Sequence, residues 1–587
     1  MFKEPKKWDE VELEVPSLGT LTGICFDKGT TQYLSVPYAS VPGRFRRPSP
    51  SAAPWPEKKW DGTKLSPFPC QPPRDFYPIP NPERPWVENP SRMSSTDCLS
   101  LNISVPTPPR SGENPEGGYP VMIFFHGGAF VYAAGGAAIY DGRVLSTVSK
   151  EDFNIPTIVI SVNFRLGVFG FLASEEIRDY NKEFDEDGVG NYGLWDQVEA
   201  LRWTKKHIAA FGGNPDRVCV FGQSAGGVSA NVHLARNEPL FSSAIIQSGL
   251  IPLCGIMTVP QYQVLYDKML TQLNIPEDLP PRQRLQRLID APEEDLAAAM
   301  VPVFVTPVIT ISPCDDGVLI GGPMPKYSEY VNFKAPEWCP RIMIGDVKNE
   351  CMIWNKAYRQ QTASSLLSLI RSFPFRTPGG AEKLIEAYGL KENMSNNETF
   401  WKIEEMCTHG LYSAVDWIVV RANPNVYAYH FDVPSPFEND WGGLAHHSLD
   451  NVYIWGLLRH MLPPQQQKVS ADLAQAWLKF ANGREPWAPF SKNGTWAVWT
   501  NTKLEERTIE QDKDRGYAIW EELEAFGKEK GIGLALIDDF YDLCDDLCMR
   551  RRQLTDPRSE IKPLKVGELG EYGIRRKSHK IAWANVP

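Results

Sequence analysis

The sequence predicts an α/β protein with a large, mostly parallel sheet that is covered by helices on both faces. Two observations carry this prediction. Strongly apolar runs at 99–105, 121–125 and 157–162 have the length of buried strands. Between the last of these and the next apolar run, at 244–249, the segment 195–211 places its apolar residues at helical spacing. Strands that alternate with helices usually form parallel sheets whose two faces are both buried.

The regions on either side of 99–249 extend the predicted architecture. Near the start of the chain, 21–26 and 32–37 are predicted to be the strands of a hairpin. The proline-rich segment 50–95 is predicted to be an irregular loop, and loops of that length in a compact domain are more often functional than idle. Residues 255–335 are acidic and helical in pattern, so we expect an insertion or cap there.

The second half of the chain predicts two further strands among helices. The strands are expected at 341–346 and 425–431, and helices over 364–421 and 471–482. The tryptophan-bearing segment 491–502 is predicted to be irregular.

The character of the sequence changes after about residue 530. Residues 534–548 are amphipathic and acidic, and Arg550-Arg-Arg552 and Arg575-Arg-Lys577 then bring positive charge. We therefore expect one α/β domain over 1–530, followed over 531–587 by a docking helix and a flexible polar tail.

The most informative stretch is the G-x-S-x-G pentapeptide at 222–226, with Ser224 at its centre. A short apolar strand precedes it and a plausible helix follows. A serine in that position is held in a strained backbone conformation that lifts its hydroxyl clear of the sheet. The flanking glycines are needed because a Cβ there would collide with neighbouring backbone. The pattern predicts a nucleophile elbow.

A nucleophilic serine needs a base within hydrogen-bond reach and an acid that orients the base. Where the serine lies on such an elbow, these residues follow in the order serine, acid, histidine. Two acids, Asp346 and Glu350, come at the end of the predicted strand 341–346 and just after it. Spacing alone does not choose between them.

The base is expected on a loop after the last strand. His446 and His447 both lie on the glycine- and histidine-bearing loop 442–450. His430 falls within the predicted strand 425–431 and is interpreted as a half-buried structural histidine. The two other downstream histidines fall in helical patterns: His409 and His460.

Donors for an oxyanion are predicted on both sides of the serine. Gly127 and Gly128 follow the apolar run 121–125, and glycine lets the backbone approach the site closely. The N–H of Ala225, directly after the nucleophile, is the other expected donor.

Composition and charge argue against several classes of function. The net charge of -11, with no basic block in the main body, argues against nucleic acid or an anionic membrane surface as the main partner. No uncharged apolar run is long enough to span a bilayer. The first ten residues lack the features of a signal peptide, and the 11 cysteines are an odd number thinly spread over a long chain. We therefore expect a reduced, cytoplasmic or otherwise intracellular protein.

The ordered motifs resemble those of the type-B carboxylesterases, the family that includes the cholinesterases and lipases of similar build. The resemblance extends from about residue 15 to residue 525. It implies the α/β-hydrolase fold, with helical insertions that form a cap. The matching segments are 33–39, 97–103, 126–130, 163–167, 170–172, 191–197, 211–215, 221–227 and 244–249.

This resemblance resolves the alternatives among the site residues. The family's acid is a glutamate in a G-x-x-x-[ND]-E pattern, which selects Glu350 over Asp346. The family's histidine precedes a segment that ends in an aromatic–glycine pair, and 447–456 matches with His447 in register. Ser248 matches a serine that supports the acid–histidine pair in an auxiliary role.

The chain also departs from the family pattern in its structural residues. Thr96 stands where the family usually has glutamate, so an ion pair to Arg44 is expected to be lost or rerouted. In secreted relatives the cysteines that match Cys70 and Cys98 form a disulfide. The sequence leaves that pairing open here.

Two further departures concern the substrate. Glu88 stands where cholinesterases have the tryptophan that binds a quaternary ammonium, although Trp86 is nearby. Gln223 stands where cholinesterases usually have glutamate, directly before the nucleophile. Choline esters are therefore not expected as substrates.

The predicted function is a serine hydrolase that cleaves small-molecule carboxylic esters through an acyl-enzyme, with Ser224, Glu350 and His447 as the catalytic triad. This chemistry requires no metal and no organic cofactor. An acyltransferase or cyclising esterase of a biosynthetic pathway would use the same triad with another acceptor. A non-catalytic binding protein on this fold is a third hypothesis, which the presence of all three triad residues disfavours. The sequence sets neither the ester nor the oligomeric state.

Overall fold

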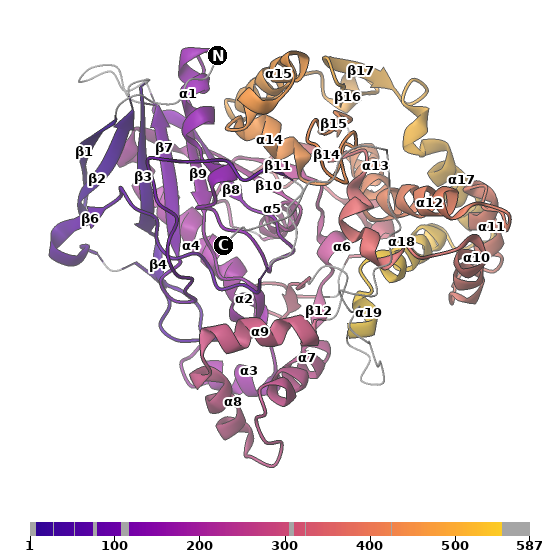
Figure 1. Ribbon diagram of the computed structural model, residues 1–587, viewed down its shortest axis with the longest axis horizontal. Helices are drawn as coiled ribbons and strands as arrows, with labels where there is room; N and C mark the ends of the chain where they lie inside the picture. Colours follow the sequence, from indigo (N-terminus) through magenta and orange to yellow (C-terminus); the bar gives the residue numbers. More distant parts are fainter. Residues whose placement is uncertain are drawn as a thin grey trace.

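A 13-stranded sheet forms the centre of the molecule in the computed structural model (Figure 1). Its strand order is β1-β2-β3-β7-β9-β8-β10-β11-β14-β15-β16-β17, and β6 pairs with β2 beside this path. The strands from β9 to β16 in this order run parallel, whereas the strands at both edges of the path are antiparallel. The predicted mostly parallel sheet is confirmed. The structure describes residues 8–26, 29–51, 53–73, 79–106, 117–236, 238–304, 310–322, 325–423 and 425–554.

The sheet strands and two small strand pairs have defined bounds. These are β1 Trp8–Val15, β2 Gly19–Phe26, β3 Thr30–Pro37, β4 Ala39–Ser40, β5 Ser49–Pro50, β6 Lys59–Asp61, β7 Ser100–Pro106, β8 Tyr119–Phe125, β9 Ile158–Val162, β10 Gly213–Gln223, β11 Ser243–Gln247, β12 Met257–Thr258, β13 Cys314–Asp315, β14 Arg341–Val347, β15 Tyr427–Phe431, β16 Thr495–Trp499 and β17 Leu504–Thr508.

The α-helices lie between and after these strands. They are α1 Arg143–Glu151, α2 Gly167–Phe171, α3 Glu175–Lys182, α4 Tyr192–His207, α5 Ala225–Ala235, α6 Ile251–Cys254, α7 Val259–Gln272, α8 Pro281–Asp290, α9 Glu293–Val303, α10 Ala363–Ser372, α11 Gly380–Ala387, α12 Asn396–Thr408, α13 Ala414–Ala422, α14 Leu449–Trp455, α15 Pro464–Ala481, α16 Phe490–Asn493, α17 Tyr517–Glu529, α18 Ala535–Cys548 and α19 Arg551–Leu554. Short 3₁₀ segments are η1 Pro56–Lys58, η2 Ala138–Tyr140, η3 Ile208–Phe211, η4 Tyr327–Asn332, η5 Glu350–Ala357, η7 Arg459–Met461 and η8 Lys513–Arg515, and η6 His409–Ser413 is a π-turn.

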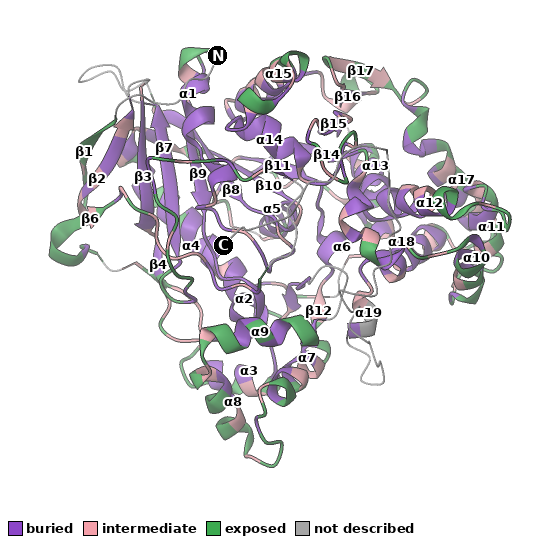
Figure 2. Cartoon of the chain, in the orientation of Figure 1, coloured by how far each residue is buried: buried purple, intermediate pink, exposed green. Residues whose placement is uncertain are grey.

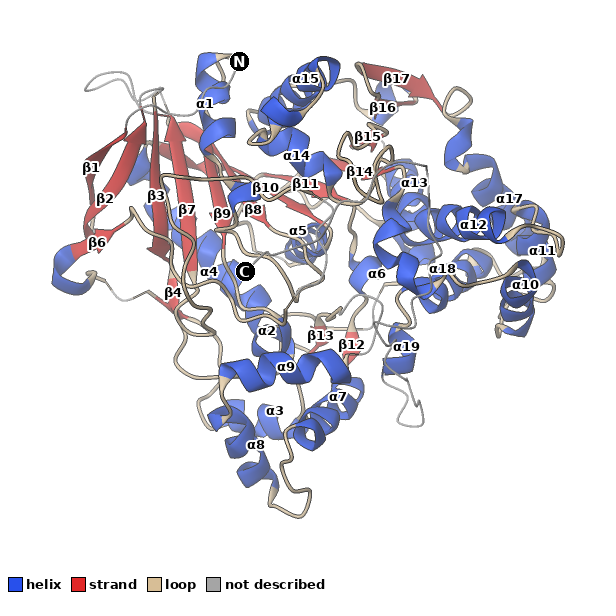
Figure 3. Cartoon of the chain, viewed as in Figure 1, coloured by secondary structure: helices blue, strands red, loops and turns tan. Residues whose placement is uncertain are grey.

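Alternate side chains of the central strands enter two separate cores. On β8, Val121, Ile123 and Phe125 belong to one core, and Met122 and Phe124 belong to the other. Helices α4, α5 and α13 contribute to the first core, and α1, α14 and α15 contribute to the second (Figure 3). The central strands are therefore buried on both faces (Figure 2).

The segment predicted as an insertion forms a helical lobe, at the bottom of Figure 1. Helices α7, α8 and α9 make up most of it, together with α3, and their outer surfaces are exposed (Figure 2). Each of the three is amphipathic, and apolar side chains such as Leu265, Leu285 and Leu296 are buried. The chain that follows α9 reaches the end of the sheet, where Ile311 N donates to Ala129 O at 3.1 Å.

One predicted element is wrong. The segment 491–502, expected to be irregular, contains strand β16, which pairs with β15 and β17 inside the sheet. Trp496 and Val498 enter one core, and Ala497 and Trp499 enter the other. Because both faces are apolar, the segment lacks the polar–apolar alternation that marks a half-buried strand. The loop 442–450 consequently follows β15, which is not the last strand of the sheet.

The predicted helix near the C-terminus is present as α18, and it packs against α12 and α17. The first two basic residues after it contact the rest of the protein: Arg550 Nη2 donates to Ala357 O at 2.7 Å, and Arg551 Nε donates to Asp545 Oδ1 at 2.7 Å. The basic cluster Arg575-Arg-Lys577 lies outside the described residues, and the boundary near residue 530 stays a prediction. Within the described ranges, no helix combines the length and hydrophobicity needed to cross a bilayer.

A buried ion pair joins the loop after β9 to α4. Arg165 Nη2 and Nε donate to Asp196 Oδ1 and Oδ2 at 2.7 and 2.9 Å, and Arg165 Nη1 donates to Arg46 O at 2.8 Å. Burial alone would lower the pKa of Arg165, but Asp196 outweighs burial and raises it. The bidentate geometry compensates for the desolvation of both charges.

We predict that Arg165→Met lowers the free energy of unfolding by about 3–5 kcal/mol, because Asp196 would remain as an unpaired buried charge. Arg178→Met is the matched control. Its ion pair with Glu175 is accessible to solvent, and its loss should cost less than about 1 kcal/mol. Urea unfolding followed by tryptophan fluorescence measures both variants, and equal losses would contradict the expectation.

Candidate active site

Ser224 lies at the turn between β10 and α5, at the carboxyl ends of the parallel strands. Its backbone has φ 58° and ψ −124°, which non-glycine residues rarely adopt. The N–H of Ser224 donates to Gln247 O at 2.8 Å, and its carbonyl accepts from Val228 N at 3.0 Å. Strand β11 and helix α5 thus hold the strained turn that the sequence predicts.

Two positions of the pentapeptide accept only glycine, because a Cβ at either one would collide with backbone atoms. A Cβ on Gly222 would lie 2.2 Å from Gly226 O, and a Cβ on Gly226 would lie 1.8 Å from Phe125 O. Both contacts are with backbone, so no side-chain movement would relieve them. The start of α5 therefore lies directly against the end of β8, and Ser224 lies beside the turn that follows β8.

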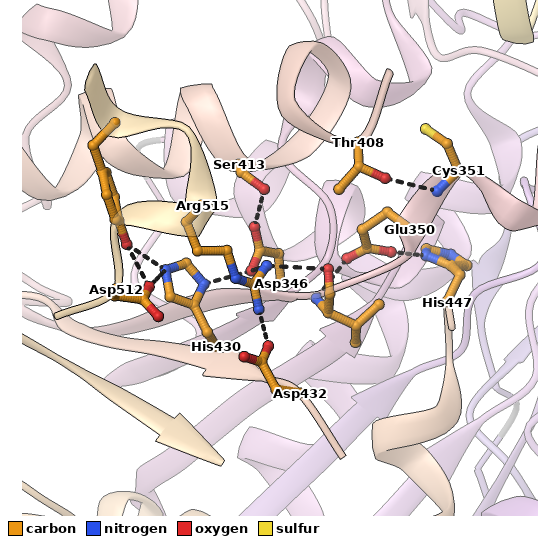
Figure 4. Close-up of polar contacts among 12 residues, drawn as sticks. Asp346, Glu350, Cys351, Thr408, Ser413, His430, Asp432, His447, Asp512 and Arg515 are labelled. Carbon is orange, nitrogen blue, oxygen red and sulfur yellow. Dashed lines mark hydrogen bonds and ion pairs between the residues drawn. The ribbon is translucent and has the colours of Figure 1, made fainter. Parts of the chain in front are cut away.

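Glu350 and His447 are hydrogen bonded to each other (Figure 4). Glu350 opens η5 after β14, and His447 lies in the loop after β15. Nδ1 of His447 donates to Glu350 Oε2, and Glu350 Oε1 accepts from Val347 N at 2.9 Å. Because Nδ1 carries the proton, Nε2 of His447 is left as an acceptor. Both side chains are buried.

Main-chain hydrogen bonds bring these two loops together. Asn349 N donates to Ala445 O at 2.8 Å, and Lys348 N donates to Phe431 O at 3.1 Å. Strands β14 and β15 are parallel neighbours, so the loops that follow them both begin at the carboxyl ends of the strands. The backbone thus sets the approach of Glu350 to His447.

Asp346, the alternative acid, belongs to a separate buried cluster (Figure 4). It accepts hydrogen bonds from His430 Nδ1 at 2.6 Å, from Arg515 Nη1 at 3.0 Å and from Ser413 Oγ. Burial alone would raise the pKa of Asp346, but Arg515 and His430 outweigh burial and hold the pKa at about 2. His430 Nε2 in turn bonds Tyr517 Oη at 2.8 Å. This cluster does not include His447.

The remaining histidine candidates have other partners. Nδ1 of His446 bonds His447 O at 3.0 Å, and burial lowers the pKa of His446 to about 4. His409 bonds Tyr388 Oη at 3.1 Å, and His460 bonds Leu457 O at 3.1 Å. Among the described residues, His447 is the histidine that contacts Glu350.

The turn that contains Gly127 and Gly128 passes directly against Ser224. A Cβ on Gly127 would lie 3.0 Å from Ser224 Cβ, and Gly128 has φ +103°. The N–H groups of Gly127, Gly128 and Ala225 have no acceptor among the hydrogen bonds of the described residues. Unpaired backbone donors near a nucleophilic serine are the groups that stabilise an oxyanion in acyl transfer.

His126 holds the orientation of this turn. Its Nδ1 donates to Gly127 O at 2.8 Å, and its ring stacks on Phe164 with centroids 4.5 Å apart. Burial lowers the pKa of His126 to about 4, so the ring is neutral at pH 7. The Gly127 carbonyl and the Gly128 N–H belong to one planar peptide and point in opposite directions. The sequence singled out His126 only as part of a motif and missed this role.

Ser248, the predicted auxiliary residue, contacts the site through its backbone. It has φ 49°, and its N–H donates to Gly345 O at 2.8 Å. Its buried hydroxyl makes no hydrogen bond to Glu350 or His447 in the described part of the chain. The structure therefore does not bring the Ser248 side chain onto the acid–histidine pair.

Nε2 of His447 faces Gln223 in this structure. The distance from His447 Nε2 to Gln223 Nε2 is 3.1 Å. Ser224 is partly exposed, and within the described ranges its hydroxyl has no hydrogen-bond partner. The structure thus joins His447 to Glu350 and places Ser224 beside the N–H donors, without a hydrogen bond between Ser224 and His447.

Helix α12 supplies a buried carboxyl near Glu350, Glu404, which was not predicted from the sequence. Glu404 Oε1 accepts from Thr408 Oγ1 at 2.9 Å, and Oε2 accepts from Asn349 Nδ2 at 3.4 Å. Thr408 Oγ1 also accepts from Cys351 N at 3.1 Å. Burial raises the pKa of Glu404 to about 8, so the carboxyl is neutral at pH 7. Both neighbours of Glu350 in the chain are thereby held by α12.

A second residue missed by the sequence is Tyr412. It lies in the π-turn η6, and its ring centroid is 5.6 Å from that of His447. Two buried polar residues one turn apart, Glu404 and Thr408, were a readable signal on α12. The π-turn was not predicted, because 364–421 was expected to be helical without its turns being resolved.

The departures from the family pattern have structural outcomes. Arg44 is rerouted, since its Nη1 donates to Ile289 O and Ala291 O, each at 2.7 Å. Cys70 and Cys98 are both buried free thiols.

No group of three or more His, Cys, Asp or Glu in the described ranges has an arrangement that could hold a metal ion.

Comparison with known proteins decides the family. A model of the carboxylesterase family matches residues 9–521. The chain belongs to the carboxylesterase family. It is a carboxylic-ester hydrolase, and the match agrees with the extent of the resemblance seen in the motifs.

The enzyme is similar to several curated proteins over most of its length. Lipase 3 of Yarrowia lipolytica is 26% identical over 500 residues, which cover 81% of this chain and 89% of that protein. Acetylcholinesterase of Bungarus fasciatus is 29% identical over 525 residues, which cover 84% and 81%. Para-nitrobenzyl esterase of Bacillus subtilis is 28% identical over 499 residues, which cover 78% and 88%.

Solved structures confirm the α/β-hydrolase fold. A carboxylesterase of Geobacillus stearothermophilus has a TM-score of 0.68 at 25% identity, covering 87% of this chain and 99% of that chain. A PNB esterase structure has a TM-score of 0.63 at 25% identity, covering 86% and 99%.

We predict that Glu404→Gln stabilises the enzyme at pH 8.5 and has a smaller effect at pH 5. The pKa of Glu404 is about 8 in the folded enzyme, above its ordinary value of 4.5. Between these values the folded state holds a proton that the unfolded chain has released, so stability falls as the pH rises from about 4.5 to about 8. Glutamine stays neutral at every pH and removes this loss.

Thermal unfolding midpoints of the wild type and the variant at the two pH values measure the effect. Glu405→Gln is the matched control, because Glu405 is the next residue on α12 and pairs with Lys402 at an accessible site. A Glu404→Gln effect of equal size at pH 5 and pH 8.5 would contradict the prediction.

Proposed function

We propose that the enzyme hydrolyses uncharged carboxylic esters through an acyl-enzyme intermediate on Ser224. One observation carries this proposal: unpaired N–H groups lie in the turns at and beside a strained serine, and a carboxylate-held imidazole contacts Gln223, the residue before that serine. Each part meets a separate requirement of acyl transfer, namely the nucleophile, the base with its orienting acid, and the oxyanion donors.

Acylation begins with attack of Ser224 Oγ on the ester carbonyl carbon, while His447 Nε2 accepts the hydroxyl proton. Glu350 keeps the proton on Nδ1 and stabilises the imidazolium that forms. The carbonyl oxygen becomes an oxyanion that accepts hydrogen bonds from N–H groups of Gly127, Gly128 and Ala225. His447 then protonates the leaving alcohol, and the acyl group stays on Ser224.

Deacylation repeats these steps with water as the nucleophile. His447 Nε2 takes a proton from the attacking water, and the same N–H groups stabilise the second oxyanion. Collapse of this intermediate releases the carboxylic acid, and the proton returns to Ser224 Oγ. The relatives that are named as esterases and as a lipase favour water over an alcohol or amine as the acceptor.

The choice of Glu350 as the acid rests on how the two carboxylates are occupied. Asp346 already accepts from His430, Arg515 and Ser413. Glu350 accepts one backbone N–H and offers its other oxygen to His447. This difference in partners supports Glu350, rather than Asp346, as the acid that orients the base.

Trp86 supports the exclusion of choline esters from the proposed substrates. The Arg143 guanidinium carbon lies 4.2 Å from the centroid of the Trp86 ring, and the tryptophan is buried. A ring face that already binds an internal cation is not available to a quaternary ammonium group.

We predict that Ser224→Ala and His447→Ala each lower kcat/KM for p-nitrophenyl butyrate by at least about 10³-fold. Glu350→Gln should lower it by about 10²–10⁴-fold, because the imidazole loses its orienting carboxylate. Asp346→Asn should keep kcat per fluorophosphonate-labelled site within about tenfold of the wild type, since labelling counts the folded sites.

The reverse pattern, with Glu350→Gln active and Asp346→Asn inactive per labelled site, would show that the acid is Asp346. Undiminished turnover by purified Ser224→Ala would disprove the whole assignment.

We further predict that kcat/KM is at least about 100-fold higher for p-nitrophenyl butyrate than for butyrylthiocholine, because the Trp86 ring already binds Arg143 and is not available to the ammonium group. Both reactions are followed by absorbance at the same enzyme concentration. A preference for the thiocholine ester would contradict the substrate class.

A further inference from the structure

Gln223 occupies the position on His447 that the proposed mechanism requires for Ser224. Its Nε2 lies 3.1 Å from His447 Nε2. Because Nδ1 of His447 donates to Glu350, Nε2 carries a lone pair, and the Gln223 amide N–H is the donor in this contact. At its other end, Gln223 Oε1 accepts from Ser448 Oγ at 2.9 Å. The two bonds agree on one orientation of the amide group.

The Gln223 side chain has little freedom to leave this position. It is the last residue of β10 and is 1% exposed. A Cβ on Gly127 would lie 2.8 Å from Gln223 Oε1, so the amide packs on the turn that carries the oxyanion donors. Its other partner, Ser448, directly follows His447 and precedes the first residue of α14, with φ 69°. Gln223 therefore lies between the oxyanion turn, the base and the residue after the base.

We propose that Gln223 is a positioning residue whose hydrogen bond holds the His447 imidazole in the resting enzyme. When the ester is attacked, His447 Nε2 must exchange the Gln223 amide for the Ser224 hydroxyl. This inference rests on the proposed function, in which His447 Nε2 accepts the serine proton. An imidazole nitrogen has one lone pair and accepts one good hydrogen bond at a time. The Gln223 bond and the Ser224 bond thus compete.

The competition predicts different effects for two substitutions of Gln223. Methionine has a similar length and no N–H, so Gln223→Met leaves the Nε2 lone pair to Ser224. Glutamate also lacks the N–H, and its negative charge favours the protonated imidazole. The other titratable groups that face His447 are unchanged in both variants: Glu350 from η5, Tyr412 from η6, His446 from the same loop and Asp450 from α14.

The test is the pH dependence of kcat/KM for p-nitrophenyl butyrate, expressed per fluorophosphonate-labelled site. For Gln223→Met, we expect the plateau to rise by about 3–10-fold, the size of one hydrogen bond to a neutral acceptor. For Ser448→Ala, which releases the far end of the amide, we expect a rise of about twofold. For Gln223→Glu, the midpoint of the acidic limb should move up by about one pH unit.

Gln197→Met is the matched control. Gln197 is also buried and also bonded to a histidine, with His233 Nε2 at 2.8 Å from its Oε1, but neither residue contacts the triad. Its profile should match that of the wild type within about twofold.

The proposed role of Gln223 would be wrong if the kcat/KM plateau were unchanged or lower for both Gln223→Met and Ser448→Ala. It would also be wrong if Gln223→Glu did not move the acidic limb of the kcat/KM profile. Failure of the proposed function has a different signature. In that case the wild type would neither turn over the ester nor carry the fluorophosphonate label on Ser224, and both proposals would fall together.

Discussion

The contact between Gly226 and the Phe125 carbonyl determines where the active site is built. No side chain fits between them, since a Cβ would lie 1.8 Å from the oxygen. Helix α5 therefore begins against the end of β8, which places Ser224 beside Gly127 and Gly128. The strained backbone of Ser224 costs about 1–3 kcal/mol, and main-chain hydrogen bonds to β11 and α5 hold it in place. Backbone packing thus positions the nucleophile beside the oxyanion donors, and the His126 side chain holds the turn that carries Gly127 and Gly128.

The acid–base pair depends on a second constraint: two buried carboxylates, Asp346 at the end of β14 and Glu350 at the start of η5, have different partners. Asp346 is saturated by its donors and stays ionised, with a pKa of about 2. Arg515, one of those donors, also donates to Val347 O at 3.4 Å. The N–H of Val347 in turn donates to Glu350 at 2.9 Å. The ionic cluster therefore holds Val347, the residue whose N–H orients Glu350, and Glu350 keeps one oxygen for His447.

Most of the fold was predictable, because the central strands are apolar on both faces and alternate with helices. Strand β16 was missed for the same reason, since Trp496 and Trp499 serve opposite cores. Spacing left Glu350 and Asp346 open, and only the family resemblance separated them. The Gln223 contact was beyond prediction, because it depends on which partner His447 Nε2 meets across two loops.

The most direct measurement is a crystal structure of the enzyme inactivated by a butylphosphonate ester. We predict a phosphorus–oxygen bond to Ser224 and a phosphoryl oxygen about 3 Å from N–H groups of Gly127, Gly128 and Ala225. We also predict that His447 Nε2 has left Gln223 for the Ser224 oxygen or the leaving-group side. An adduct on another residue, or a phosphoryl oxygen that points away from the three N–H groups, would contradict the assignment of Ser224 and its oxyanion donors.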